Sequence, residues 1–441
     1  MGEELDVPIK SYSPKNYENS YIKYGLNQVQ GWKKSMEDYV IDFTEPDKEK
    51  FLNIFGIFDG HGGREVPKYL SEHFIEYLQK NENFQKGKYK EALTETFFVI
   101  DKSFKTEEVK NELVKISKEF KLTKEQEIKE INNLYGKGEN LNEDELEQIK
   151  AFKDVFEPRN IENVNIADIS GSTGIIIFLG DKNIYIANAG NSRCLVVNKE
   201  GAIINKTRDH TMNDPEEKAR VELARSFNED EEKKEGDEKG QAEYLESTRS
   251  FGDWEFKGNN WIDQKDQEVS VEPEIFEVPI NNVKYLIMGS HGMFESNIND
   301  NENDDTINGQ VCKFFVEEIK KNKPYSNIIQ EYFEKIIPEK NDGNNNKGLD
   351  NMSCIVINLK NDSINQYIKK KDLALEDNKK KEEEDNEKKK EEDNKKKENE
   401  RKKKEEEEEE ERKKKEEEEK KEKENELINN EENIIENNNK I

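Results

Sequence analysis

Short apolar runs separated by polar turns constrain the fold of this chain most. The runs are rich in Ile, Val and Phe, as in "FLNIFGIFD", "TGIIIFLG", "NIYIANAG", "RCLVVNKEGAII", "KYLIMGS" and "MSCIVINL". Their brevity and polar ends predict antiparallel strands rather than a parallel sheet. Residues 66–78 and 92–104 place apolar side chains at helical spacing. We therefore predict an α+β fold, a β-sandwich of two antiparallel sheets flanked by helices.

Capping patterns predict further helices. At 213–224, Asp214 would cap a helix, Pro215 fits its first turn and Glu217 would complete a capping box. Residues 106–165 have the composition of a charged helical insertion. Within this insertion the capping-box spacing occurs twice, at Thr123 with Gln126 and at Asn142 with Glu145. The ligand pattern of a calcium loop is absent there, and the composition of residues 228–240 predicts a separate acidic loop.

Composition divides the chain into a folded body and a polar tail. Only 31% of the residues are hydrophobic and 39% are charged, which is too polar for an entirely globular chain. Residues 366–441 alternate blocks of Lys and Glu, so opposite charges recur four residues apart and stabilise a solvated helix by about 0.2–0.5 kcal/mol per pair. We predict one domain over 1–365 and a tail that is a charged helix or disordered spacer rather than a coiled coil; a partner-binding arm is the alternative.

The net charge of −29 argues against nucleic acid and anionic membrane as partners. Three scattered cysteines form no disulfide or zinc pattern, and no apolar run approaches the roughly 20 residues that span a bilayer. Because the start lacks the apolar core of a signal peptide, we expect a cytoplasmic protein, with the nucleus as alternative. Gly2 is a poor myristoylation candidate because Asp6 stands where Ser or Thr is preferred.

Four groups of motifs combine glycine, acidic residues and strand ends. They are "QGWKKSMEDY" (30–39), "FGIFDGHGG" (55–63), "GNSRCLVV" (190–197) with "TRSFGDWEFK" (248–257), and "GLDNMS" (348–353). Asp59 ends a predicted strand, and the glycines after it would let its carboxylate and the Gly60 carbonyl face one ion. Oxygen ligands of this kind suit Mg²⁺ or Mn²⁺. Taken alone, the same residues also fit a tight turn with an Asx hydrogen bond.

The order and spacing of these motifs, with "LDVP" near the start, "RDHTMND" at 208–214 and "EPEI" at 272–275, resemble the PP2C family of metal-dependent protein serine/threonine phosphatases. The resemblance covers about residues 5 to 360 and implies that family's β-sandwich. It implies two metal ions bridged by Asp59, with Glu37 and the Gly60 carbonyl on one and Asp350 on the other. Asp38 would assist beside the ligands, and His61 would protonate the leaving serine or threonine oxygen.

Three positions depart from the family pattern. Ser290-His291-Gly292 replaces Ser-Asp-Gly, so His291 stands where a metal-binding carboxylate is expected. An imidazole adds no negative charge and favours manganese, iron or zinc over magnesium. Glu295 stands at the family's second acidic position in this motif and partly compensates for the charge that His291 lacks. Asn191 replaces an aspartate linked to a third, weaker metal and keeps an oxygen without the charge, so a third site at Asn191 and Glu295 should be weak or empty. Lys33 replaces the phosphate-binding arginine and cannot make its two-pronged contact.

Two functions remain open on these residues. One is a Mg²⁺- or Mn²⁺-dependent phosphatase of phosphoserine and phosphothreonine with an altered, weaker site. The other is a catalytically inactive pseudophosphatase that binds a phosphoprotein or regulatory partner. In either case the acidic chain should favour partners with basic phosphosites.

Overall fold

The computed structural model describes residues 4–44, 52–136, 164–227, 246–295, 304–340 and 348–438, without the side chains of Asp6, 124–136 and 427–438. The chain divides into two compact units, Met1–Gln366 and Tyr367–Ile441. The insertion is described only in part. The acidic loop at 228–240, Gly2, and the helix start predicted at Asn142 and Glu145 lie outside the described residues.

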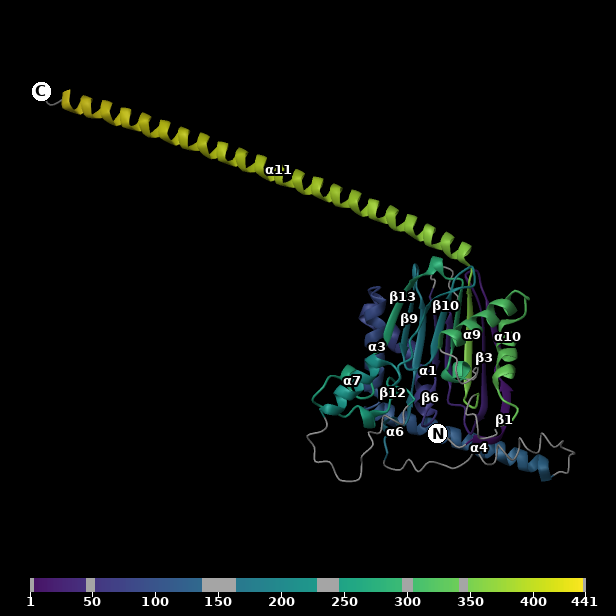
Figure 1. The fold of residues 1–441 in the computed structure, drawn as a ribbon. Helices are drawn as coiled ribbons and strands as arrows, with labels where there is room; N and C mark the ends of the chain where they lie inside the picture. The colour runs from purple at the N-terminus through teal and green to yellow at the C-terminus, as the bar shows by residue number, and fades with distance from the viewer. Residues whose placement is uncertain are drawn as a thin grey trace. The chain divides into compact units, whose positions relative to one another are not determined.

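Two antiparallel sheets form the centre of the first unit, as predicted (Figure 1). The strands of the larger sheet, in spatial order, are β1 (Glu4–Tyr12), β3 (Ile22–Lys33), β15 (Met352–Leu359), β14 (Tyr285–Gly289), β10 (Arg193–Val197) and β11 (Ile203–Lys206), and β2 (Lys15–Glu18) also pairs with β3. The second sheet runs β13 (Glu274–Pro279), β9 (Asn183–Ala189), β8 (Gly174–Leu179), β5 (Asn53–Phe58) and β4 (Tyr39–Thr44). The sheets face each other, and the rings of Tyr24 on β3 and Phe55 on β5 lie 5.0 Å apart between centroids.

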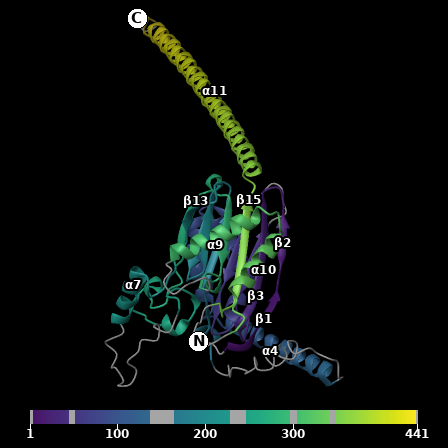
Figure 2. The ribbon, with the colours of Figure 1, turned by 45° about the vertical axis from the view of Figure 1, so that its right-hand side comes forward.

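Helices cover the outer face of each sheet (Figures 1 and 2). The smaller sheet packs through Ile54, Ile176 and Phe178 against α1 (Glu65–Lys80), α3 (Tyr89–Ser103) and the first part of α4 (Glu107–Gly136). The larger sheet packs against α8 (His291–Glu295), α9 (Asp304–Ile319) and α10 (Tyr325–Ile336). Short helices complete this unit: α2 (Glu82–Gln85), α6 (Ile166–Ile169), α7 (Pro215–Ser226), η2 (Trp254–Phe256), η3 (Gln264–Asp266) and η4 (Ile280–Asn282).

This layering explains why the apolar runs are continuous. An antiparallel strand with one wet face alternates apolar and polar residues. In β8 and β5, however, all residues are buried because the sheet has protein on both faces. The predicted strands appear where expected, except that 193–204 forms two strands, β10 and β11, with a turn at Gly201, where φ is +85°.

Two helix predictions need correction. The helix expected to start near Thr123 is the continuation of α4, and the Thr123 hydroxyl donates to the Glu119 carbonyl instead of capping. Asp214 does cap α7, since its carboxylate accepts the N–H groups of Glu216 and Glu217. Glu217 does not complete a capping box, because its carboxylate accepts hydrogen bonds from Arg220, Thr248 and Arg249.

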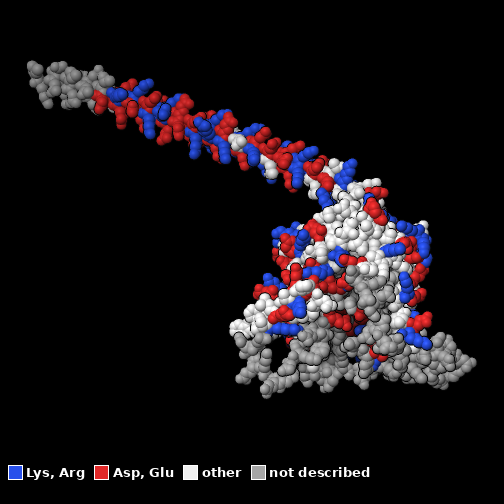
Figure 3. All heavy atoms as spheres, in the orientation of Figure 1, with Lys and Arg blue, Asp and Glu red and all other residues white. Residues whose placement is uncertain are grey.

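The tail forms one helix, α11 (Asn361–Asn438), of 78 residues. At about 1.5 Å per residue it is about 117 Å long. Its first turn belongs to the first unit, where Ile364 is buried and the Asn361 amide donates to the Val283 carbonyl. From Leu373 to Glu426 every side chain is exposed. Positive and negative side chains alternate along it (Figure 3), with ion pairs four residues apart such as Glu409 with Lys413. In the described part of the chain no helix combines the length and apolarity of a membrane span.

Candidate active site

A small third sheet brings three distant segments together. It consists of β6 (Gly60–His61), β7 (Gly171–Ser172) and β12 (Phe251–Gly252). Asp59 lies between β5 and β6, and its backbone carbonyl accepts the N–H of Thr173 at 2.9 Å. Its carboxylate accepts the N–H of His291 at 3.0 Å. Asp59 therefore joins the end of the smaller sheet to α8, which follows β14 of the larger sheet.

Three carboxylates crowd this junction. Asp38 is 3% exposed, and the Ser353 hydroxyl donates to it at 2.7 Å. Burial raises the pKa of Asp38 to about 7, and the charge of Asp350 adds to the rise. Burial and the charges of Asp38 and Asp350 likewise raise the pKa of Asp59 well above its ordinary value. Such repulsion is relieved by a bound cation, so this donor set fits divalent metal ions.

Glu37 and Asp350 are held in place through Asn351. The Asn351 side-chain oxygen accepts the N–H of Glu37 at 2.8 Å, and the Asn351 N–H donates to the Asp350 carboxylate at 2.8 Å. The Ser35 hydroxyl donates to the Glu37 carboxylate at 2.6 Å. A Cβ at position 60 would lie 2.6 Å from the Glu37 carbonyl oxygen, so glycine at 60 permits this close approach.

Lys33 is directed at a predicted metal ligand. Its ammonium lies 3.2 Å from the Asp350 carboxylate. Burial alone would lower the pKa of Lys33, but the charge of Asp350 outweighs it and raises the pKa above the ordinary value. The lysine therefore keeps its charge inside the cluster, where it competes with a cation for Asp350.

His61 forms an ion pair with Asp253. Its Nε2 lies 2.7 Å from the Asp253 carboxylate, which also accepts the Ser250 hydroxyl. Burial opposes the charged imidazole, but Asp253 outweighs burial and raises the pKa of His61 to about 9, which favours the imidazolium at neutral pH. Asp253 has a φ of +50°, and a Cβ at Gly171 would collide with both members of the pair.

A fully buried ion pair, Asp101 with Lys257, stabilises the turn around Asp253. The Lys257 ammonium lies 3.0 Å from both carboxylate oxygens of Asp101 on α3 and donates to the Ser250 carbonyl at 2.8 Å. The same carboxylate accepts the N–H of Gly252 at 2.8 Å. Asp101 and Lys257 thus hold the residues on either side of Asp253 against α3.

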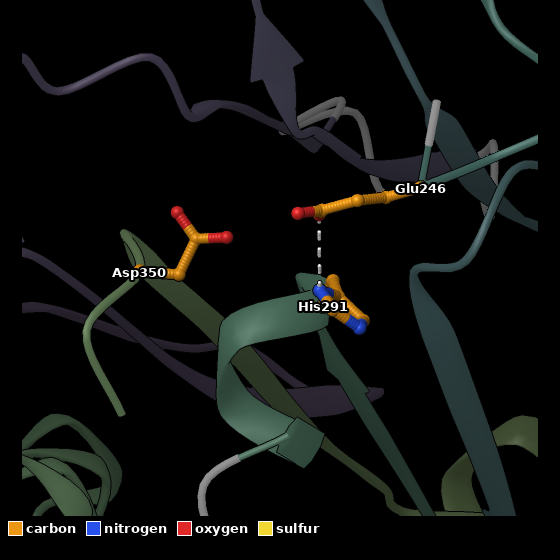
Figure 4. A group of neighbouring side chains, drawn as sticks. All are labelled: Glu246, His291 and Asp350. Atoms are coloured by element: carbon orange, nitrogen blue, oxygen red, sulfur yellow. Dashed lines mark ion pairs between the residues drawn. The ribbon is translucent and has the colours of Figure 1, made fainter. Parts of the chain in front are cut away.

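His291 begins α8, with its ring toward Glu246 and Asp350 (Figure 4). Candidate ligand atoms of these three residues all lie within 4.8 Å of one another. The His291 Nδ1 atom is inaccessible to solvent, yet it has no hydrogen-bond partner among the described residues. An unpartnered imidazole nitrogen facing two carboxylates is a second feature that fits a metal ion. Glu295 lies close enough for the charge of His291 to lower its pKa, although burial raises that pKa overall.

Asn191 is buried in the turn that leads from β9 into β10, where it is 4% exposed. The next residue, Ser192, contacts the Thr173 hydroxyl at 3.1 Å, and Thr173 in turn donates to Asp59. Within the described ranges no recorded hydrogen bond or ion pair joins Asn191 to Asp59. The other predicted site residues are linked by the contacts and charges given above.

Sequence reasoning missed Glu246 and the Asp101–Lys257 pair. Glu246 lies outside every motif, and no spacing rule relates it to His291. Asp101 could have been noticed in the sequence pattern of α3. It falls four residues after Phe97 on the buried face of α3, and a charged residue on an apolar face implies a buried partner.

Comparisons with known proteins agree with this architecture. A family model described as "PP2C: Protein phosphatase 2C" matches residues 22–119 and 114–302. "Probable protein phosphatase 2C 6" of Paramecium tetraurelia is 29% identical over 363 residues, which are 82% of this chain and 100% of that protein. "Probable protein phosphatase 2C 4" of the same organism is 30% identical, over 82% of this chain and 99% of that protein. A crystal structure of a phosphatase from Toxoplasma gondii aligns with a TM-score of 0.50 and 16% identity, covering 79% of this chain and 95% of that one, and supports the fold alone.

Proposed function

Because the chain belongs to the protein phosphatase 2C family, we propose that it hydrolyses phosphoserine and phosphothreonine in proteins with two divalent cations, Mg²⁺ or Mn²⁺. The observation that supports this most is the meeting of Asp38, Asp59 and Asp350 at one junction of the two sheets. Three carboxylates whose charges repel one another, with Asp38 buried and Asp59 and Asp350 partly buried, are costly to keep charged without a cation. The carboxylate cluster at the junction of the two sheets therefore supports a metal-dependent hydrolase.

In this proposal Glu37, Asp59, the Gly60 carbonyl, His291 and Asp350 hold the metal ions. When bound, the ions would supply a water of lowered pKa as the nucleophile that attacks phosphorus. A third ion near Asn191 and Glu295 would bind weakly, because Asn191 carries no charge.

His61 is the proposed proton donor to the leaving serine or threonine oxygen. Asp253 holds its imidazole by the 2.7 Å contact and fixes its orientation. Lys33 would neutralise the substrate phosphate after leaving Asp350, and Asp38 would orient the nucleophile from its buried position. We expect slower turnover than in a site with an arginine at 33, because lysine offers a single point of contact.

The pseudophosphatase remains the second candidate, and one observation favours it. Lys33 pairs with Asp350 at 3.2 Å, so an internal cation already neutralises a carboxylate that the metal would need. Together with His291, this lowers the negative charge available to metal ions. A fold with such a site would bind a phosphoprotein without hydrolysing it.

We place the catalytic domain at 1–365 and assign residues 366–441 the role of a charged spacer. The three free, buried cysteines are consistent with a reducing compartment, the cytoplasm or nucleus. We propose basic phosphosites as preferred substrates, since the chain carries a net charge of −29.

The proposed activity is tested by hydrolysis of a phosphothreonine peptide by the full-length protein with Mn²⁺, Mg²⁺ or a chelator. We expect activity that requires metal and falls at least about 100-fold in Asp59→Asn, which removes the bridging charge. Exposed Glu76→Gln is the control for loss of one carboxylate and should keep full activity. Chelator-resistant hydrolysis, or full activity in Asp59→Asn, would exclude the proposed mechanism.

A further inference from the structure

Glu246 lies beside His291, the imidazole that stands where a metal-binding carboxylate is expected. Its carboxylate is 3.8 Å from the His291 Nδ1 atom, and it faces Asp350 across the same space (Figure 4). The Glu246 side chain is 65% exposed, but the residues after it are buried and fixed. The Thr248 hydroxyl donates to Glu217, and the Ser247 hydroxyl donates to the His210 carbonyl. The backbone therefore presents Glu246 to His291 from an anchored segment.

We propose that Glu246, His291 and Asp350 bind one divalent transition-metal ion, with Glu246 supplying the negative charge that His291 lacks. This inference rests on the metal-dependent site of the proposed function and extends its ligand set to Glu246. One imidazole and two carboxylates give a neutral complex with a divalent ion. An imidazole ligand favours Mn²⁺ or Zn²⁺ over Mg²⁺, which prefers oxygen ligands throughout.

The geometry needs little adjustment to hold an ion. Opposed ligands at about 2.1 Å from a metal lie about 4.2 Å apart. The three donor atoms already lie within 4.8 Å of one another, and the Glu246 side chain is 65% exposed, so a small rotation can bring its carboxylate closer. Among the described residues, the Lys33 ammonium and the Asn351 N–H both contact Oδ1 of Asp350, so Oδ2 is the atom we assign to the ion.

His291 supplies the second, independent observation. Its Nδ1 atom is shielded from solvent and has no hydrogen bond to any described residue, since the Glu246 carboxylate at 3.8 Å is too far for one. A buried ring nitrogen normally has a hydrogen bond. A metal ion between Glu246 and Asp350 would satisfy this nitrogen and neutralise both carboxylates at once.

The test is Mn²⁺ binding by the full-length protein, with free Mn²⁺ measured by electron paramagnetic resonance. We expect Glu246→Gln to weaken one class of Mn²⁺ site about 10-fold or more. Glu76→Gln, which removes one exposed carboxylate on α1, should leave binding unchanged. Pulsed measurements on bound Mn²⁺ should detect coupling to a ¹⁴N nucleus, and this coupling should disappear in His291→Asp.

Equal Mn²⁺ affinity in Glu246→Gln and Glu76→Gln would overturn the inference, as would a wild-type protein without ¹⁴N coupling. Zn²⁺ should compete with Mn²⁺ more strongly than Mg²⁺ does. This readout does not depend on turnover. Metal binding that needs Glu246 in a protein that hydrolyses nothing would sustain this inference and refute the proposed function; hydrolysis with binding indifferent to Glu246 would do the reverse.

Discussion

At the scale of single residues, Gly171 decides whether His61 and Asp253 can meet. Its hydrogen points at the ion pair, where any Cβ would collide with the Asp253 carboxylate and His61 Nε2. We predict that Gly171→Ala separates the pair and lowers the rate constant of hydrolysis about 100-fold, the loss expected for a misplaced general acid. Gly258→Ala, at a glycine with open space around it, should keep the wild-type rate. Equal rates for both variants would show that the pair is not needed.

Glu217 on α7 is buried and binds the segment that follows Glu246. It is 1% exposed and accepts hydrogen bonds from Arg220, Arg249 and Thr248. Burial would raise the pKa of Glu217, but the hydrogen bond from Arg249 and the two guanidinium charges outweigh burial and lower it to about 2. Because this value lies below the ordinary 4.5, the stabilisation is complete above about pH 4.5 and is lost as the pH falls toward 2.

We therefore predict that Glu217→Gln lowers the free energy of unfolding at pH 7 by about 3 kcal/mol, because a buried charge network loses its centre. The difference from wild type should shrink at pH 3. Urea unfolding at the two pH values measures it, with the neighbouring exposed Glu216→Gln as a control near zero. A difference independent of pH would contradict the assigned charge state.

Several residues of the candidate site could be proposed from the sequence alone, and the others could not, for physical reasons. Asp59 and its glycines stand at the end of an apolar run, a local pattern visible in one motif. The meeting of Asp38 and Asp350 requires contacts across more than 300 positions, and only the family resemblance made it predictable. Glu246 belongs to no motif, so its place beside His291 emerges only from the folded chain.

At the scale of elements, the Asp101–Lys257 pair joins α3 to the turn around Asp253. Both side chains are fully buried. Breaking such a pair leaves an uncompensated charge, so we predict that Lys257→Met lowers the free energy of unfolding by about 3–5 kcal/mol. In a double-mutant cycle with Asp101→Asn, the two losses should fall short of additivity by more than about 1 kcal/mol. Strict additivity would mean that the two residues act independently.

Elements with continuous apolar runs were predictable, and those with mixed patterns were not. Strands β5, β8, β14 and β15 are buried on both faces, and each appears in the sequence as a continuous apolar run. The pattern of β13 mixes buried and partly exposed residues, because it lies at the edge of its sheet. At Thr123 the sequence predicted a helix start that does not exist. A capping-box spacing can occur by chance inside a longer charged helix, so it does not mark where that helix begins.

At the scale of the whole molecule, charge should set substrate preference. With a net charge of −29, the chain should attract phosphopeptides flanked by arginine and repel those flanked by glutamate. We predict a ratio of kcat/KM of about 10 between the two at low salt, decreasing toward one at about 0.5 M salt as screening shortens to a few ångströms. A ratio near one at low salt would refute this steering.

The central claim is that the altered metal site still hydrolyses phosphoprotein. The most direct measurement is the rate of phosphothreonine-peptide hydrolysis with Mn²⁺ and with Mg²⁺, for wild type and His291→Asp. We predict that the wild-type protein turns over with Mn²⁺ and more slowly with Mg²⁺, and that His291→Asp shifts the preference toward Mg²⁺. A wild-type protein inactive with both metals, with activity appearing only in His291→Asp, would contradict the account and identify a fold kept for binding.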